Sequence, residues 1–144
     1  MKIADGLYEN INDPKNYINA NYIKVRKNWI KKKNPFDGIE VDFIASQGPT
    51  IPSFSNFWRM IISHNVKNIV MVTNIEDNGR IKCNVYFPDP VHSQEVLEID
   101  EFITVKVVSI DKSNRFFEVR RFEVEDKRTN TKRIVNHFWV NFTK

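Results

Sequence analysis

Cys83 is the only cysteine in the 144-residue sequence, and therefore the only candidate for a thiolate nucleophile. A nucleophilic cysteine needs its pKa lowered, for instance by the free amides of a glycine-rich loop at a helix N-terminus. No glycine-rich stretch surrounds Cys83. We therefore predict a structural rather than a catalytic role for this thiol.

Metal and cofactor chemistry are not expected. A single cysteine excludes an internal disulfide framework and a zinc site built from cysteines. The three histidines, His64, His92 and His137, are scattered without the spacing of metal ligands, so each is predicted to be an ordinary surface or core residue. A lone thiol fits a reducing compartment. The sequence shows no signal peptide and no apolar run of about 18 residues, so we expect a cytoplasmic chain without a membrane span.

The densest positive cluster consists of five residues around Trp29: Arg26, Lys27, Lys31, Lys32 and Lys33. An anionic partner such as RNA, a phosphoprotein or an anionic lipid is one interpretation of this basic cluster. A solvated loop is the interpretation we favour, because the net charge is only +4 and no recognition fold surrounds the cluster. Nucleic-acid binding is therefore not expected.

The elements that would hold these residues form one unit, since no repeat or linker divides the chain. Strand formers fill residues 17–25, and a second strand is predicted near 42–46, ending at Gln47-Gly48-Pro49. A helix is predicted at about 53–64, with the Ser53 hydroxyl accepting from a first-turn amide. Its apolar residues share one stripe, at positions 54, 57, 58, 61 and 62.

The strand pattern after this helix sets the fold class. Residues 69–73 are a continuous apolar run, which predicts a strand buried on both faces and a right-handed strand–helix–strand crossover. Asn78-Gly79 predicts a hairpin turn. Alternation over 95–99, 102–110, 116–124 and 132–142 predicts antiparallel strands. The class is therefore α+β (mixed α/β), with more strand than helix.

Several segments resemble one family, the non-receptor and receptor protein-tyrosine phosphatases. They occur in the family's order and spacing: NYINANYI at 16–23, FIASQGP at 43–49, FWRMI at 57–61, NIVMVT at 68–73, GRIKCNVYFP at 79–88 and HF at 137–138. The resemblance implies a highly twisted mixed sheet covered by helices. It covers nearly the whole chain but only part of a family domain, so residues 1–144 are expected to be a truncated phosphatase-like domain.

The resemblance also implies which catalytic parts these 144 residues lack. The family uses a thiolate in a Cys-x5-Arg loop and an aspartic acid that protonates the leaving phenolate. These 144 residues contain neither, because the position six residues after Cys83 is Asp89 rather than arginine, and its carboxylate would repel phosphate. The aromatic clamp for phosphotyrosine, which in the family precedes the matched segments, is absent as well. Asp77 and Lys82 match an acidic residue and a lysine that flank a family loop supporting the active site. We expect both to be charged residues beside the hairpin turn.

Three functional hypotheses follow from the resemblance. The first is an inactive phosphatase-like protein that acts by binding host phosphoproteins or signalling proteins. Bracoviruses carry sets of such proteins, some truncated, and this Asn-, Ile- and Lys-rich sequence is similar to that group. The second is the N-terminal part of an active phosphatase whose cysteine lies downstream, and the third is a relic without function. In the family, further strands flank residues 69–73, so their loss predicts exposed sheet edges and self-association.

Overall fold

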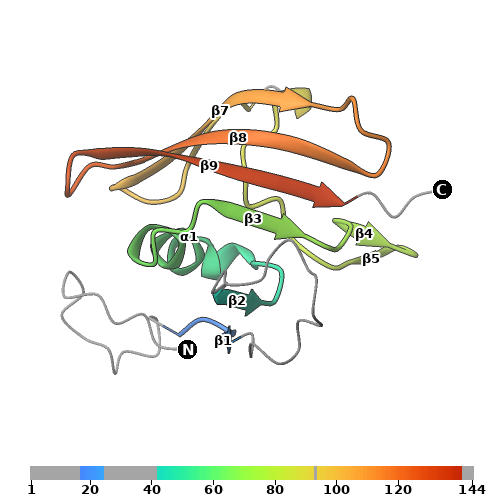
Figure 1. The fold of residues 1–144 in the computed structure, drawn as a ribbon, viewed down its shortest axis with the longest axis horizontal. Helices are drawn as coiled ribbons and strands as arrows, with labels where there is room; N and C mark the ends of the chain where they lie inside the picture. Colours follow the sequence, from blue (N-terminus) through green and yellow to red (C-terminus); the bar gives the residue numbers. More distant parts are fainter. Residues whose placement is uncertain (1–16, 25–41, 93, 141–144) are drawn as a thin grey trace, which may run out of the picture.

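The computed structural model describes residues 17–24, 42–92 and 94–140, and the described part is built around a five-stranded mixed sheet (Figure 1). Its strand order is β3-β9-β8-β7-β6. The bounds are β3 Asn68–Met71, β6 Val96–Glu98, β7 Ile103–Asp111, β8 Phe117–Asp126 and β9 Thr131–Val140. The predicted α+β class is confirmed, and so are the four antiparallel strands of the second half.

Three of the four pairings in this sheet are antiparallel, and they follow the chain order from β6 to β9. The exception is β3, which pairs with β9 in parallel, with Asn68 beside Asn136 and Met71 beside Trp139. The β7–β8 register shifts between Val107 and Ser109, which marks a β-bulge. The sheet therefore joins a meander to one strand from the first half of the chain.

The helix α1, Phe54–Ser63, confirms the helix predicted from the apolar stripe. Phe57, Trp58 and Ile61 are buried, and Trp58 contacts Phe122 of the sheet at a ring-centroid distance of 6.3 Å. The predicted capping contact is wrong. Ser53 is the N-cap residue, but its hydroxyl accepts from Thr50 N at 2.9 Å and closes the preceding 3-10 turn, Ile51–Ser53. The hydroxyl therefore forms its hydrogen bond within the 3-10 turn and does not cap the first turn of α1.

The first two strands form a separate antiparallel pair, β1 Ala20–Lys24 with β2 Asp42–Ser46. Their positions agree with the two strands predicted in this region. The predicted crossover is wrong, however, because β2 and β3 belong to different sheets. In Figure 1, α1 is drawn between the β1–β2 pair and the larger sheet. The parallel neighbour of β3 is β9, which sequence proximity could not reveal.

The burial of β3 also differs from the prediction. Its residues alternate, with Ile69 and Met71 buried and Val70 60% exposed, and the following Val72 is 65% exposed. The inner face packs into the core with α1, while the outer face is open. Within the described residues β3 has a neighbour on only one side. None of the described helices is long and apolar enough to cross a membrane.

Candidate functional site

The β4–β5 hairpin carries the two residues that the resemblance connects with an active site. The strands β4 Glu76–Asp77 and β5 Arg80–Ile81 form only two residue pairs. Asn78 and Gly79 between them have φ values of 51° and 74°. Positive φ at both central residues is the requirement of a type I′ turn, for which Asn-Gly is the preferred pair. The predicted hairpin is confirmed.

Asp77 and Lys82 are both exposed and lie on opposite arms of this hairpin. Asp77 is paired with Arg80 across the turn and accepts a hydrogen bond from Asn78 Nδ2 at 3.1 Å. Lys82 donates its backbone N–H to Ile75 O at 2.8 Å. Within the described residues neither side chain takes part in an ion pair. The hairpin thus presents its charges to solvent.

Cys83 follows this hairpin and is buried against Gly48 of the predicted Gln47-Gly48-Pro49 turn. A Cβ atom added to Gly48 would lie 2.8 Å from Cys83 Sγ, so the close approach requires glycine at position 48. The thiol donates to Asn84 O at 3.2 Å and to Pro49 O at 4.0 Å. Burial raises the pKa of the Cys83 thiol to about 11. The thiol is therefore protonated at neutral pH, as a structural role requires.

A buried hydrogen bond joins Tyr86 to the sheet. The Tyr86 hydroxyl lies 2.8 Å from Nε2 of His137, on β9, and both side chains are in the core. Burial lowers the pKa of His137 to about 3, and the nearby charge of Arg120 acts in the same direction. Burial also raises the pKa of the Tyr86 hydroxyl far above its usual value. His137 is thus a neutral core histidine, in agreement with the prediction.

Arg120 is the neighbour of His137 on β8 and is itself buried. Its guanidinium lies 4.8 Å from the ring centroid of Phe87 and 4.9 Å from that of Trp139. Its NH2 group donates to Glu118 at 3.0 Å. The alternation of the strands places Arg120 and His137 among apolar residues of the inner face. That alternation is the signal from which the polar cluster could have been predicted.

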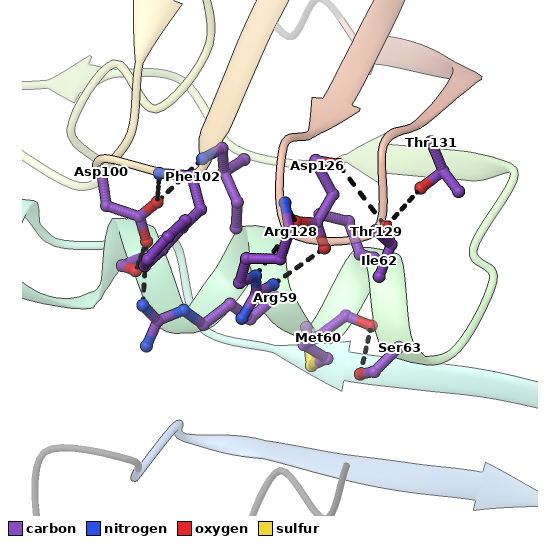
Figure 2. A network of polar contacts seen from close by, with 12 residues as sticks. Arg59, Met60, Ile62, Ser63, Asp100, Phe102, Asp126, Arg128, Thr129 and Thr131 are labelled. Atoms are coloured by element: carbon purple, nitrogen blue, oxygen red, sulfur yellow. Dashed lines mark hydrogen bonds and ion pairs between the residues drawn. The ribbon is translucent and has the colours of Figure 1, made fainter. Parts of the chain in front are cut away.

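A second polar network fastens α1 to the sheet (Figure 2). Asp100, in the turn between β6 and β7, accepts from Arg59 of α1 at 2.9 Å and from Ser55 at the start of α1. The same carboxylate accepts from the backbone N–H groups of Phe102 and Ile103 at 2.9 and 2.8 Å. Figure 2 shows how Asp100 bridges the helix and the turn. Sequence reasoning did not find this contact.

The network continues in the β8–β9 turn. The carboxylate of Asp126, at the end of β8, accepts from Arg128 Nε at 3.0 Å and from Arg128 NH2 at 2.8 Å. Asp126 is almost fully buried, and it also accepts from the Arg128 backbone N–H at 3.0 Å. These contacts shape the turn in Figure 2. In both parts of the network, an aspartate carboxylate accepts from an arginine guanidinium, which is a structural role.

A cavity of about 190 Å³ lies beside β1, β2 and the N-terminus of α1. Its lining is uncharged: Tyr17, Ile18, Asn19, Ser46, Gln47, Pro49, Thr50, Ser53 and Phe57. Asn19 and Gln47 bond each other across it, with Asn19 Nδ2 donating to Gln47 Oε1 at 3.0 Å. Such a lining lacks the cations that would hold a phosphate group.

His64 lies at the C-cap of α1, and its ring is within hydrogen-bond distance of the Tyr22 hydroxyl, at 3.0 Å. The side chain of His92 and the whole basic cluster of Arg26, Lys27, Lys31, Lys32 and Lys33 lie outside the described residues. Among the residues that the structure describes, no three His, Cys, Asp or Glu side chains gather in the manner of a metal site.

Residues 6–142 match the family described as protein-tyrosine phosphatase. The chain is 33% identical over 120 residues to Tyrosine-protein phosphatase 1 of Caenorhabditis elegans, which covers 83% of this chain and 10% of that protein. It is 32% identical over 131 residues to human Tyrosine-protein phosphatase non-receptor type 20, covering 90% of this chain and 27% of the relative.

A receptor-type relative gives a similar match. Receptor-type tyrosine-protein phosphatase S of Gallus gallus is 32% identical over 123 residues, which cover 85% of this chain and 7% of that protein. The chain therefore spans about a quarter or less of the relatives named here. The matched region contains the hairpin, the Gly48–Cys83 contact and the Tyr86–His137 pair. With nearly its whole length matched, the chain belongs to the protein-tyrosine phosphatase family.

Proposed function

We propose that these 144 residues form a scaffold part of a protein-tyrosine phosphatase domain and do not themselves hydrolyse phosphotyrosine. The observation that carries this proposal is the state of Cys83, the one thiol in the sequence. It is buried, and its pKa is raised to about 11. Phosphate transfer to cysteine needs a thiolate in an exposed, electropositive setting.

The neighbours of Cys83 stabilise its protonated form. Sγ has the carbonyl oxygens of Asn84 and Pro49 as hydrogen-bond acceptors, so a negative charge on sulfur would face two partial negative charges. Gly48 lies so close to the thiol that an added Cβ atom would be 2.8 Å from Sγ. Position 89, where the family's loop would carry arginine, is Asp89. These features support an inactive 144-residue unit.

In the leading form of this proposal, the chain acts by binding. It competes for phosphoproteins or signalling proteins instead of dephosphorylating them. The chain resembles bracovirus phosphatase-like proteins. On this basis, the proposed location is the cytoplasm of a host cell, and the proposed effect is interference with immune signalling. Self-association through an open sheet edge belongs to the same proposal, since β3 exposes Val70 and lacks a second neighbour among the described strands.

A second candidate is the N-terminal part of an active phosphatase, with the nucleophilic cysteine encoded downstream. The small share of each relative that the chain spans favours it, as does the open edge of β3. In that case Asp77 and Lys82, on the exposed β4–β5 hairpin, would support the active site contributed by the rest of the domain. A relic without function is the third candidate.

A phosphatase assay tests the proposal directly. The purified 144-residue chain, given a phosphotyrosine peptide, is expected to release no phosphate above buffer. The matched control is Cys83→Ser, which preserves the size of the side chain and removes the thiol. Turnover by the parent chain that disappears in Cys83→Ser would overturn the proposal, because it would make the buried thiol the nucleophile.

The two leading candidates are distinguished by the mass of the protein made from its native gene. A mass near 17.1 kDa supports an inactive, binding protein of this length. A substantially larger mass supports the active phosphatase with a downstream cysteine. In the first case the chain should then be used as bait, and phosphoproteins retained by it should be released by competing phosphotyrosine peptide.

A further inference from the structure

The turn of the β4–β5 hairpin contains the only Asn-Gly pair in the sequence, Asn78-Gly79. Both residues are exposed, and a Cβ atom placed on Gly79 would have no atom within 4 Å. The Asn78 side chain makes one hydrogen bond among the described residues, from Nδ2 to Asp77 Oδ1 at 3.1 Å. An asparagine followed by glycine in open solvent is chemically unstable, because glycine has no side chain to shield its amide.

We propose that Asn78-Gly79 is a site of spontaneous deamidation. The backbone nitrogen of Gly79 attacks Cγ of Asn78, a new N–Cγ bond forms, and the Cγ–Nδ2 bond breaks. The proton from the Gly79 amide leaves with Nδ2, which departs as ammonia. The product is a five-membered succinimide. Solvent water then adds to either carbonyl carbon and returns a proton to nitrogen, which gives aspartate or isoaspartate at position 78.

The hairpin allows the backbone rearrangement that this reaction needs. Only two residue pairs close it, Glu76 with Ile81 and Asp77 with Arg80, and all four of these residues are exposed. Hairpins of this size are marginal on their own and open readily. The succinimide can therefore form during brief local openings that leave the core around Cys83 intact.

The reaction changes both the charge and the backbone of the hairpin. Residues 76–82 contain two acidic and two basic side chains, Glu76 and Asp77 against Arg80 and Lys82, so their formal charge is zero. Deamidation makes it −1 and places a second carboxylate next to Asp77. Isoaspartate also adds one carbon to the main chain, which a two-residue type I′ turn cannot accommodate. The isoaspartate product is expected to lose the β4–β5 pairing.

The test is prolonged incubation of the intact 144-residue chain at mildly alkaline pH, followed by peptide mass mapping. The peptide containing Asn78 is expected to gain about one dalton, the change from amide to acid. Enzymatic methylation of isoaspartate should label the same peptide. Two internal controls exist: Asn65 and Asn130 also have positive φ, but β-branched Val66 and Thr131 follow them, so their peptides should stay unchanged.

A second measurement tests whether Asn78 deamidates in the folded chain as well as in a flexible peptide of the same sequence. A synthetic peptide with residues 74–84 is incubated beside the folded chain. Deamidation at position 78 in both supports the proposal. Deamidation of the free peptide with an unchanged folded chain would overturn it, because the native turn would then protect Asn78. Equal mass gains at Asn65 and Asn130 would overturn it as well.

Discussion

His137 and Arg120 are buried side chains whose polar groups are costly to remove from water. They are neighbours on β9 and β8, and both lie in the core. The Arg120 guanidinium donates to Glu118 and lies over two aromatic rings, whereas His137 stays neutral beside Tyr86. A second positive charge at His137 would face the Arg120 guanidinium in a region of low dielectric constant.

This arrangement predicts a loss of stability in mild acid. The pKa of His137 falls from 6.5 to about 3 on folding, so between these values the unfolded chain binds the extra proton. The free energy of unfolding should therefore decrease as the pH falls from 6.5, by at most about 1.4 kcal/mol per pH unit. The measurement is denaturant unfolding of the parent chain and His137→Gln over that range.

The glutamine variant is a suitable control because its amide oxygen can still accept from the Tyr86 hydroxyl. Its stability should change less with pH above the range in which carboxylates titrate. Burial alone would raise the pKa of Asp100. The hydrogen bonds from Ser55, Phe102 and Ile103, together with the charge of Arg59, outweigh burial and lower this pKa. Asp100 therefore does not titrate in the pH range used to measure His137. Parallel pH profiles for the two chains would contradict the role assigned to His137.

At the scale of elements, local patterns predicted α1 and the hairpins well. The stripe from Phe54 to Ile62 fixed the helix, and Asn78-Gly79 fixed the β4–β5 turn, because both depend on residues close in sequence. The crossover and the burial of β3 were predicted wrongly. An apolar run indicates that a strand is buried but not which strand lies beside it, and the partner of β3 is β9.

In the candidate site, too, local features could be predicted from the sequence, whereas long-range contacts could not. The structural role predicted for Cys83 agrees with the burial of its thiol. The position of Asp77 and Lys82 beside a turn was also predictable. The bridge from Asp100 to Arg59 was not, because it joins residues 41 positions apart. Nothing in the local sequence marks such a pair.

Asp100→Ala is predicted to destabilise the attachment of α1 to the sheet. The substitution removes the acceptor for Ser55, Arg59 and the backbone amides of Phe102 and Ile103. A loss of about 2–3 kcal/mol in unfolding free energy is expected, because hydrogen bonds to a charged acceptor are lost in a half-buried place. Denaturant unfolding gives the value.

Asp111→Ala provides the matched control for this substitution. Asp111 also accepts from a backbone amide two residues later, Ser113 N at 2.8 Å, but it lies on an exposed hairpin turn and holds no helix. Its replacement should change the stability little. An equal loss in both variants would show that the turn contacts, rather than the bridge to α1, account for the effect.

At the scale of the whole molecule, the two edges of the five-stranded sheet differ. The β6 edge is three residues long and carries Glu98, and the bulge in β7 lies beside it. Short length, charge and bulges are features that prevent strands of different molecules from pairing. The β3 edge has no charged residue from Asn68 to Ile75 and exposes Val70 and Val72. Association between molecules is therefore expected at β3.

Val70→Lys is predicted to reduce self-association of the 144-residue chain. A lysine at this exposed edge position opposes pairing through like charges and hydration, and it leaves the inner face of β3 unchanged. Sedimentation velocity over a range of concentrations measures the effect. Val96→Lys, at an exposed position of the opposite edge strand, is the control and should associate like the parent chain. A parent chain that is monomeric at every concentration would refute this prediction.

The parallel pairing of β3 with β9 has a consequence for how the protein is made. Asn68 and Asn136, which bond each other through their side chains at 3.0 Å, are 68 positions apart. During translation, α1 and β3 leave the ribosome long before β9 has been synthesised. Contacts of such long range form slowly, and the nascent chain meanwhile exposes Trp58, Ile69 and Met71. Chaperone dependence during synthesis is the expected consequence of pairing β3 with a strand that is made so much later.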